Sequence, residues 1–225
     1  RTTAALKNGL LPHRASTVDD KSFTTGIKGN IGDWKVDFSN TFGRNSFDFT
    51  IENTANATLG ASTPREFNAG GFAFSQNTTN LDLSNFYEDV FEGLNVAFGA
   101  EYRLENYQLI AGEEASWASY DVNGDVVSAS TPDDDKVYSY FGRLVPGGSQ
   151  VFPGYRPENA TDANRNSYAG YLDVEADITE DFLVSAALRY EDYNDFGNTF
   201  NWKVASRYKV TDNIALRAAA STGFR

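Results

Sequence analysis

The chain has 225 residues, no Cys, a single His and a formal net charge of −12, from 19 basic and 31 acidic side chains. The lack of Cys excludes disulfides, thiolate metal sites and a cysteine nucleophile, and any His-based metal site or catalytic triad would rest on His13 alone. The acidic balance argues against nucleic acid as the main partner, because phosphate binding needs clustered Lys and Arg.

Aromatic residues make up 14% of the chain, although only 40% of it is hydrophobic. A disordered acidic chain would be poor in aromatic residues, so this chain is expected to fold. No apolar run approaches the ~18 residues of a membrane helix. Two classes of protein therefore remain: a polar, aromatic-rich soluble β protein, and a transmembrane β-barrel, in which only every second residue of a strand meets lipid.

The first half of the chain contains four segments in which apolar and polar residues alternate, as in a strand with one apolar face. They predict strands near residues 23–31, 34–51, 81–83 and 94–104. In the second segment the apolar residues change from even to odd positions around Gly43, as they would at a β-bulge.

The second half alternates more regularly, and it predicts strands near residues 168–178, 182–190, 202–208 and 214–220. The apolar residues that mark these strands fall at even positions, and many of the residues between them are charged or polar. Antiparallel pairing requires this shared parity, because directly opposite residues lie on the same face. The sequence therefore predicts an all-β, antiparallel up-and-down meander of about eight strands.

The connections differ in length from one side of this meander to the other. The short ones are residues 32–33, about 87–93, 179–181 and 210–213, and the long ones are about 53–75, 112–166 and 192–200. A soluble sandwich mixes both kinds at both ends, whereas short turns at one rim and long loops at the other are typical of an outer-membrane barrel.

Aromatic residues also fall near both ends of the predicted strands. Tyr168, Tyr190 and Trp202 lie toward the long loops, and Phe182 and Tyr208 lie toward the short turns. Eight residues separate Phe182 from Tyr190, which spans ~20 Å along a tilted barrel and fits the ~25 Å apolar band. We interpret them as interfacial girdles, with ordinary β-core aromatics as the alternative.

Residues 188–225 read LRYEDYNDFGNTFNWKVASRYKVTDNIALRAAASTGFR. This run, together with residues 33–40, 42–60, 94–117 and 151–157, resembles the barrel of TonB-dependent outer-membrane receptors. The resemblance implies a protein of the bacterial outer membrane, without enzymatic activity, cofactor or resident metal. It further implies energy-coupled import of a large, scarce ligand such as a ferric siderophore, cobalamin or an oligosaccharide.

No segment here resembles the plug domain or the TonB box of that family, and Gly223–Phe224–Arg225 is not the aromatic-ended last strand of a complete barrel. The resemblance implies a barrel of about 22 strands, so residues 1–225 are expected to be part of one barrel, with the plug and the last strands absent. The implied partners are outer-membrane lipid, the protein's own plug, the inner-membrane TonB complex and a small extracellular ligand.

In such a barrel the apolar face meets lipid and the charged face lines the lumen. The predicted lumen-facing residues are Glu101, Arg103, Glu105, Asp173, Glu175, Asp177, Arg189, Lys203, Arg207 and Arg217. They would contact the plug or guide the ligand. The alternative is a solvated wall of charges that compensate one another, and exposed pairs of that kind are worth little individually.

Ligand recognition is expected in the long loops. Aromatic faces and Arg guanidinium groups suit sugar rings, catecholates and carboxylates. The candidates are Tyr138, Tyr140, Phe141, Arg143, Phe152, Tyr155, Arg156, Tyr193 and Phe196. The alternative for each of them is that it packs the loops against one another.

Other motifs carry weaker signals. Asp121, Asn123 and Asp125 have the opening spacing of a calcium loop, but Pro132 stands where that loop needs Glu, so a hairpin turn is favoured. Residues 133–135 form an acidic run that is interpreted as solvated, with a weak cation site as the alternative. Three tripeptides match the glycosylation pattern, at Asn56, Asn77 and Asn159, although the pattern is short and common.

Two functions compete with the receptor. A passive porin-like channel would lack a plug, and a soluble carbohydrate-binding β domain would fold as a monodisperse monomer without detergent.

Overall fold

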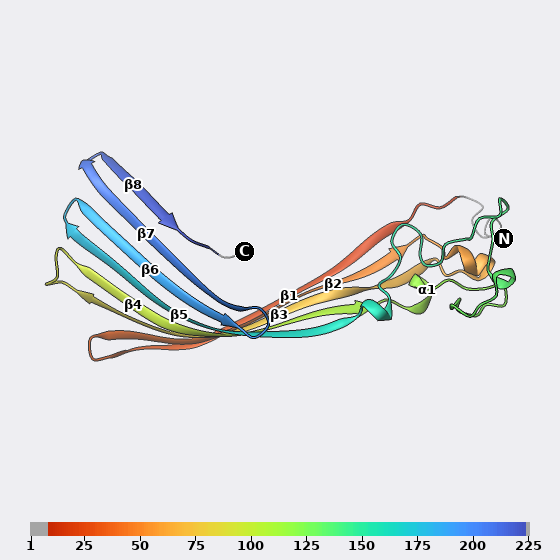
Figure 1. Ribbon diagram of the computed structural model, residues 1–225, viewed down its shortest axis with the longest axis horizontal. Coiled ribbons are helices and arrows are strands. Elements are labelled where there is room, and N and C mark those ends of the chain that lie inside the picture. Colours follow the sequence, from red (N-terminus) through yellow and green to blue (C-terminus); the bar gives the residue numbers. More distant parts are fainter. Residues whose placement is uncertain (1–8, 224–225) are drawn as a thin grey trace. The chain divides into compact units, whose positions relative to one another are not determined.

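The computed structural model describes residues 9–223, so the terminal Phe224 and Arg225 of the last motif lie outside the described residues. Within that range, eight strands form one sheet whose spatial order is the chain order, β1 to β8 (Figure 1). The strands are β1 (His13–Ile31), β2 (Trp34–Glu52), β3 (Glu66–Tyr87), β4 (Leu94–Ala111), β5 (Thr161–Thr179), β6 (Phe182–Tyr193), β7 (Gly197–Thr211) and β8 (Ile214–Ser221). The predicted all-β meander is confirmed.

Within residues 9–223, helical structure is confined to four short segments in the connections: η1 (Ala57–Ser62), α1 (Glu114–Trp117), η2 (Asp133–Asp135) and η3 (Pro157–Asn159). Among the residues that the structure describes, no helix is both long enough and apolar enough to cross a membrane.

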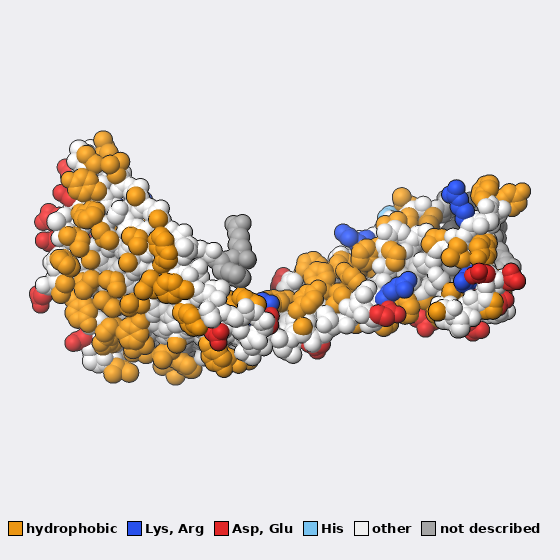
Figure 2. Space-filling model, in the orientation of Figure 1, with side chains coloured by type: hydrophobic (Ala, Val, Ile, Leu, Met, Phe, Trp, Pro, Cys, Tyr) orange, Lys and Arg blue, Asp and Glu red, His pale blue; other side chains and the backbone are white. Residues whose placement is uncertain are grey.

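The register of β5, β6 and β7 confirms the shared parity. Leu188 lies opposite Leu172 on one side and Trp202 on the other, whereas the adjacent Ala187 lies opposite Asp173 and Lys203. Even positions thus form an apolar face and odd positions a polar face, across strands that are paired directly. Figure 2 shows the hydrophobic side chains gathered on the surface of these strands.

The short connections predicted at residues 32–33, about 87–93, 179–181 and 210–213 are present, as turns over residues 32–33, 88–93, 180–181 and 212–213. The prediction of a long loop over residues 192–200 is wrong. β6 continues to Tyr193 and β7 begins at Gly197, which leaves residues 194–196 as a tight turn. Gly197 has φ +97°, a conformation that favours glycine. The Asp, Asn and Gly residues that suggested a loop lie partly in this turn and partly in the adjoining ends of β6 and β7.

The strands near the two remaining long loops extend further than their apolar residues predict. β3 begins at Glu66, within the predicted 53–75 loop, and β1 begins at His13. These loops are therefore reduced to residues 53–65 and 112–160. The residues added to β1 are largely polar, so the alternation rule did not mark them. Those added to β3 include Phe67, Phe72 and Phe74, which do not keep to one parity.

The chain divides into two compact units. Unit 1 comprises the described parts of residues 1–21, 44–75 and 106–163, and unit 2 comprises the described parts of residues 22–43, 76–105 and 164–225. Unit 1 holds both long loops. Unit 2 holds the short turns and the two-faced strand segments described above.

The core cluster of unit 1 explains why the apolar parity changes at Gly43. Beyond that residue, Phe49 and Ile51 pack with Ala69 of β3. Phe47 and Phe72 pack against this cluster, and so do Phe152 and Tyr155, which come from the long loop. The face of β2 that is polar in unit 2 is thus apolar in unit 1, where a loop covers it. β2 runs unbroken through Gly43, and the bulge there stays a prediction.

Candidate functional site

The long loop contains a small exposed turn, which we call the loop tip (residues 138–144). Tyr138 forms a β-bridge with Leu144, and the backbone N–H of Ser139 donates to the carbonyl of Arg143 at 2.8 Å. Tyr140 is 97% exposed and Phe141 is 83% exposed, with their ring centroids 5.4 Å apart. The structure thus brings four of the predicted ligand-binding residues together: Tyr138, Tyr140, Phe141 and Arg143.

Two other predicted ligand-binding residues are packed instead into the core cluster. The ring centroid of Phe152 lies 5.5 Å from that of Phe49 and 6.0 Å from that of Tyr155. The Arg14 guanidinium lies 5.6 Å from the centroids of both Phe49 and Phe152. Phe152 and Tyr155 therefore follow the alternative interpretation, in which these residues pack the loop rather than bind a ligand. Arg156, which follows them, is exposed.

The last two predicted ligand-binding residues stack on each other at the β6–β7 turn. The rings of Tyr193 and Phe196 are 4.3 Å apart and nearly parallel, and the Arg165 guanidinium lies 5.3 Å from the Phe196 centroid. Arg165 Nε also donates to Asp195 Oδ2 at 2.8 Å. These contacts lie in unit 2, whereas the loop tip lies in unit 1.

A network of charges occupies the polar face of unit 2. Glu101 Oε1 accepts hydrogen bonds from Arg103 Nη2 at 2.6 Å and from Arg189 Nη2 at 3.1 Å. Arg189 also pairs with Glu191, at 2.7 Å. All four side chains are less than one-third exposed, and the group carries no net charge. It brings together residues of β4 and β6 that lie 88 positions apart in the sequence.

The remaining predicted lumen-facing residues form longer ion pairs or are placed by strand register alone. Arg207 Nη2 lies 3.9 Å from Asp177 Oδ1, and Arg165 Nη1 lies 3.9 Å from Glu105 Oε2. Arg217 lies directly opposite Arg207 in the β7–β8 register. The others are placed by register alone: Asp173 and Lys203 opposite Ala187, and Glu175 opposite Ser185. Charge compensation therefore describes only part of the set.

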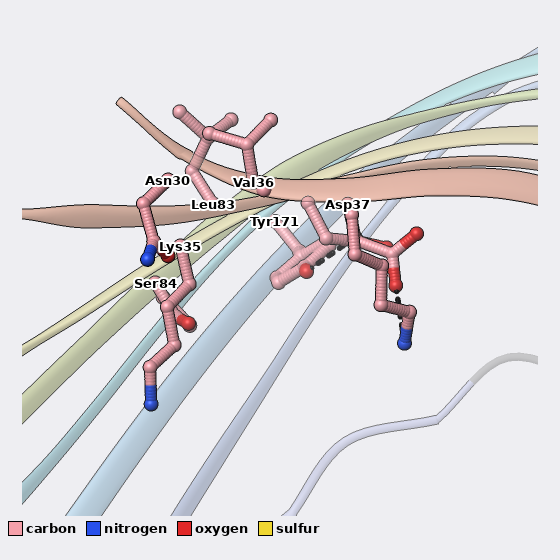
Figure 3. Close-up of a pocket in the computed structure, with 11 residues that line it drawn as sticks. Asn30, Lys35, Val36, Asp37, Leu83, Ser84 and Tyr171 are labelled. Atoms are coloured by element: carbon pink, nitrogen blue, oxygen red, sulfur yellow. Dashed lines mark hydrogen bonds and ion pairs between the residues drawn. The ribbon is translucent and has the colours of Figure 1, made fainter. Parts of the chain in front are cut away.

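A cavity of about 550 Å³ opens on the same polar face (Figure 3). Lys28 Nζ pairs with Asp37 Oδ2 at 2.8 Å, and the Tyr171 hydroxyl donates to Asp82 Oδ1 at 2.6 Å. Asp37 Oδ1 is buried and has no hydrogen-bond partner. The sequence did not single out Lys28, Asp37 or Tyr171 as functional residues. Alternation assigns each to a strand, but only the side-by-side order of the strands brings them together.

Gly99 of β4 allows Tyr171 to reach Asp82. A Cβ atom there would lie 2.6 Å from both Tyr171 Cε1 and Asp82 Oδ1, and 2.7 Å from the Leu81 carbonyl oxygen. We expect Gly99→Val to break the Tyr171–Asp82 hydrogen bond and to lower the free energy of unfolding by about 1–3 kcal/mol.

Chemical unfolding of the purified protein measures this effect. Gly29→Ala is the matched control, because its added Cβ would meet no atom within 4 Å. Equal stability of the Gly99 variant and the native protein would contradict the close approach of Tyr171.

The pKa values of Tyr120 and Asp121, two neighbouring residues of the long loop, are shifted. Burial and the hydrogen bond to Glu114 raise the pKa of Tyr120 to about 12. Hydrogen bonds from the backbone N–H groups of Asp125 and Asn123 lower the pKa of the Asp121 carboxyl. Because Asp121 accepts these bonds within a turn closed by the Tyr120–Val126 bridge, the predicted hairpin turn over the calcium-like spacing is confirmed.

Comparison with known proteins identifies a family and a solved structure that resemble this chain. A family model described as TonB dependent receptor-like, beta-barrel, matches residues 3–225. Among solved structures, the siderophore receptor PiuA from Acinetobacter baumannii matches with a TM-score of 0.42 and 15% identity, over 93% of this chain and 29% of that chain. The chain thus spans less than a third of that receptor's length. No curated protein matches.

Proposed function

Because the chain belongs to the TonB dependent receptor-like β-barrel family, whose members lie in the bacterial outer membrane, we propose that it serves energy-coupled uptake of a large, scarce ligand. Ferric siderophores, cobalamin and oligosaccharides are the ligand classes that this function implies. The observation that carries the proposal is the division of the strands in unit 2 between an apolar face and a face of ion pairs.

In the proposed receptor, the even positions of β5 to β8 meet lipid. Leu172, Leu188, Trp202 and Leu216 are each about 40% exposed or more on that face, which suits contact with acyl chains rather than with water. Aromatic residues flank them, with Tyr190 toward one end of β6 and Phe182 toward the other. The family places the protein in a membrane, so the alternative of a soluble carbohydrate-binding domain is set aside.

The polar face would line the lumen and contact the plug. Three buried side-chain atoms on this face have no hydrogen-bond partner: Asp37 Oδ1, Arg103 Nε and Arg207 Nε. A buried polar atom without a partner costs about 1–3 kcal/mol. In the proposed receptor, the plug is the element that would lie against this face.

The ligand would first meet the loop tip. Tyr140 and Phe141 offer exposed aromatic faces, and Arg143 adds a guanidinium group that pairs with carboxylates. Energy for release would come from the inner-membrane TonB complex, acting through parts of the receptor outside residues 1–225. No catalytic step is involved.

A deletion strain complemented with the complete gene tests this function. Ferric chelates, cobalamin or glycans are each supplied as the only source of iron, cofactor or carbon. We expect growth on one class only, and we expect it to be lost when the TonB complex is removed. Uptake that persists without that complex would identify a passive porin-like channel instead.

A further inference from the structure

One asparagine in the β2–β3 connection is fully buried. Asn56 is 0% exposed, and its side chain lies between two loops that are distant in the sequence. Asn56 Nδ2 donates to the carbonyl oxygens of Ala115 and Ala118, each at 2.9 Å. Asn56 Oδ1 accepts from the backbone N–H of Thr58 at 3.1 Å and from its hydroxyl at 2.6 Å. Both donors and the acceptor of this amide are thus satisfied.

The hydrogen bonds continue beyond Asn56. The Thr58 hydroxyl, having donated to Asn56, accepts from the backbone N–H of Tyr120 at 3.0 Å. The backbone N–H of Asn56 itself donates to Thr63 Oγ1 at 2.7 Å. The Asn56 side chain therefore connects the start of η1 to α1, through Ala115, and to Ala118, the residue that follows α1.

The returning end of the long loop is fixed at the same place. Ser149 forms a β-bridge with Asn56, and its backbone N–H donates to the Ser116 carbonyl at 2.9 Å. The N–H of Gly154 donates to that same carbonyl, also at 2.9 Å. A Cβ at Gly154 would lie 2.0 Å from Ser116 Oγ, so the two segments are in close contact. Both ends of the loop that carries the tip thus meet at Asn56.

We propose that Asn56 is a positioning residue, which holds the two ends of the long loop against the β2–β3 connection and thereby places the loop tip for its ligand. The ligand-presenting part of this inference rests on the proposed function. Burial also removes Asn56 as a glycosylation site, because an acceptor asparagine must be accessible.

The side-chain chemistry explains why an amide is needed. Aspartate has the same shape but no donor, so Asn56→Asp would place a carboxylate against the carbonyl oxygens of Ala115 and Ala118. A buried charge that faces acceptors is strongly unfavourable, and the loop would separate from the β2–β3 connection instead. Thr58→Val removes the second connection without adding charge, and Thr58→Ser restores the hydroxyl.

Spin labels test this role in the whole receptor, expressed from its complete reading frame and kept in outer-membrane vesicles. Residues 1–225 contain no Cys, so Glu66→Cys at the start of β3 and Phe141→Cys at the tip supply specific label sites. The native background should give one narrow distribution of label-to-label distances. Asn56→Asp and Thr58→Val should each lose that single maximum, whereas Thr58→Ser should keep it.

Asn159→Asp is the matched control, because Asn159 is exposed, and it should leave the distribution unchanged. Heat-modifiable migration in gels shows that the barrel of each variant is folded, so a folded Asn56→Asp barrel with an unchanged narrow distribution would overturn the proposal. The labels report without any ligand. If the native receptor took up none of the ligand classes while Asn56→Asp still broadened the distribution of distances, the proposed function would be rejected and the positioning role would stay supported.

Discussion

Replacing Phe49 with Ala should lower the free energy of unfolding of unit 1 by about 3–5 kcal/mol, the cost of removing a buried phenyl ring and leaving a cavity. Phe49 is 9% exposed, and its ring contacts those of Phe72, Phe152 and Tyr155. Phe72 belongs to a strand, whereas Phe152 and Tyr155 belong to the long loop. The lost contacts are therefore those that hold the loop on the sheet.

Hydrogen exchange of the backbone amides of residues 112–160, followed by mass spectrometry on the whole receptor, measures this loss. The N–H of Gly112 donates to the Tyr155 carbonyl, and the N–H of Tyr155 donates to the Ala69 carbonyl, so peptides containing these amides should exchange faster. Phe141→Ala is the matched control, because the ring removed there is 83% exposed. Exchange in the Phe49 variant as slow as in that control would show that the ring does not secure the loop.

The strands could be predicted from the sequence because the period of a strand is local. Val174, Ala186 and Val204 each fall at an even position and follow a charged or polar residue, and the structure pairs all three across adjacent strands. No knowledge of distant contacts was needed, because shared parity follows from antiparallel pairing itself.

The long-range contacts were not predictable in the same way. Phe152 and Tyr155 are aromatic residues of a long loop, which is what a ligand site is expected to contain. The structure instead packs them against a face of β2, and the alternation of apolar and polar residues does not predict this contact. Asn56 matched a short surface motif, and its burial follows from loop packing. Lys28 and Asp37 meet only because the hairpin places them on neighbouring strands.

The division into two faces gives the second large effect. Ala186 lies midway between Phe182 and Tyr190 on β6, is exposed, and pairs with Val174 and Val204. If this face meets lipid as we propose, position 186 lies near the middle of the apolar band. We expect Ala186→Arg to destabilise the barrel by about 2–4 kcal/mol, the cost of a cation at the bilayer midplane.

The adjacent residue provides the control that separates lipid contact from mere crowding. Ala187 lies on the opposite face, opposite Asp173 and Lys203, and an arginine there would gain the Asp173 carboxylate as a partner. Ala187→Arg should therefore change stability by less than about 1 kcal/mol, because an ion pair of this kind contributes little in either direction. Reversible unfolding of the whole receptor from lipid vesicles measures both variants. Equal losses at positions 186 and 187 would contradict the assignment of the even face to lipid, because substitutions with the same side chain one residue apart differ only in the face on which they lie.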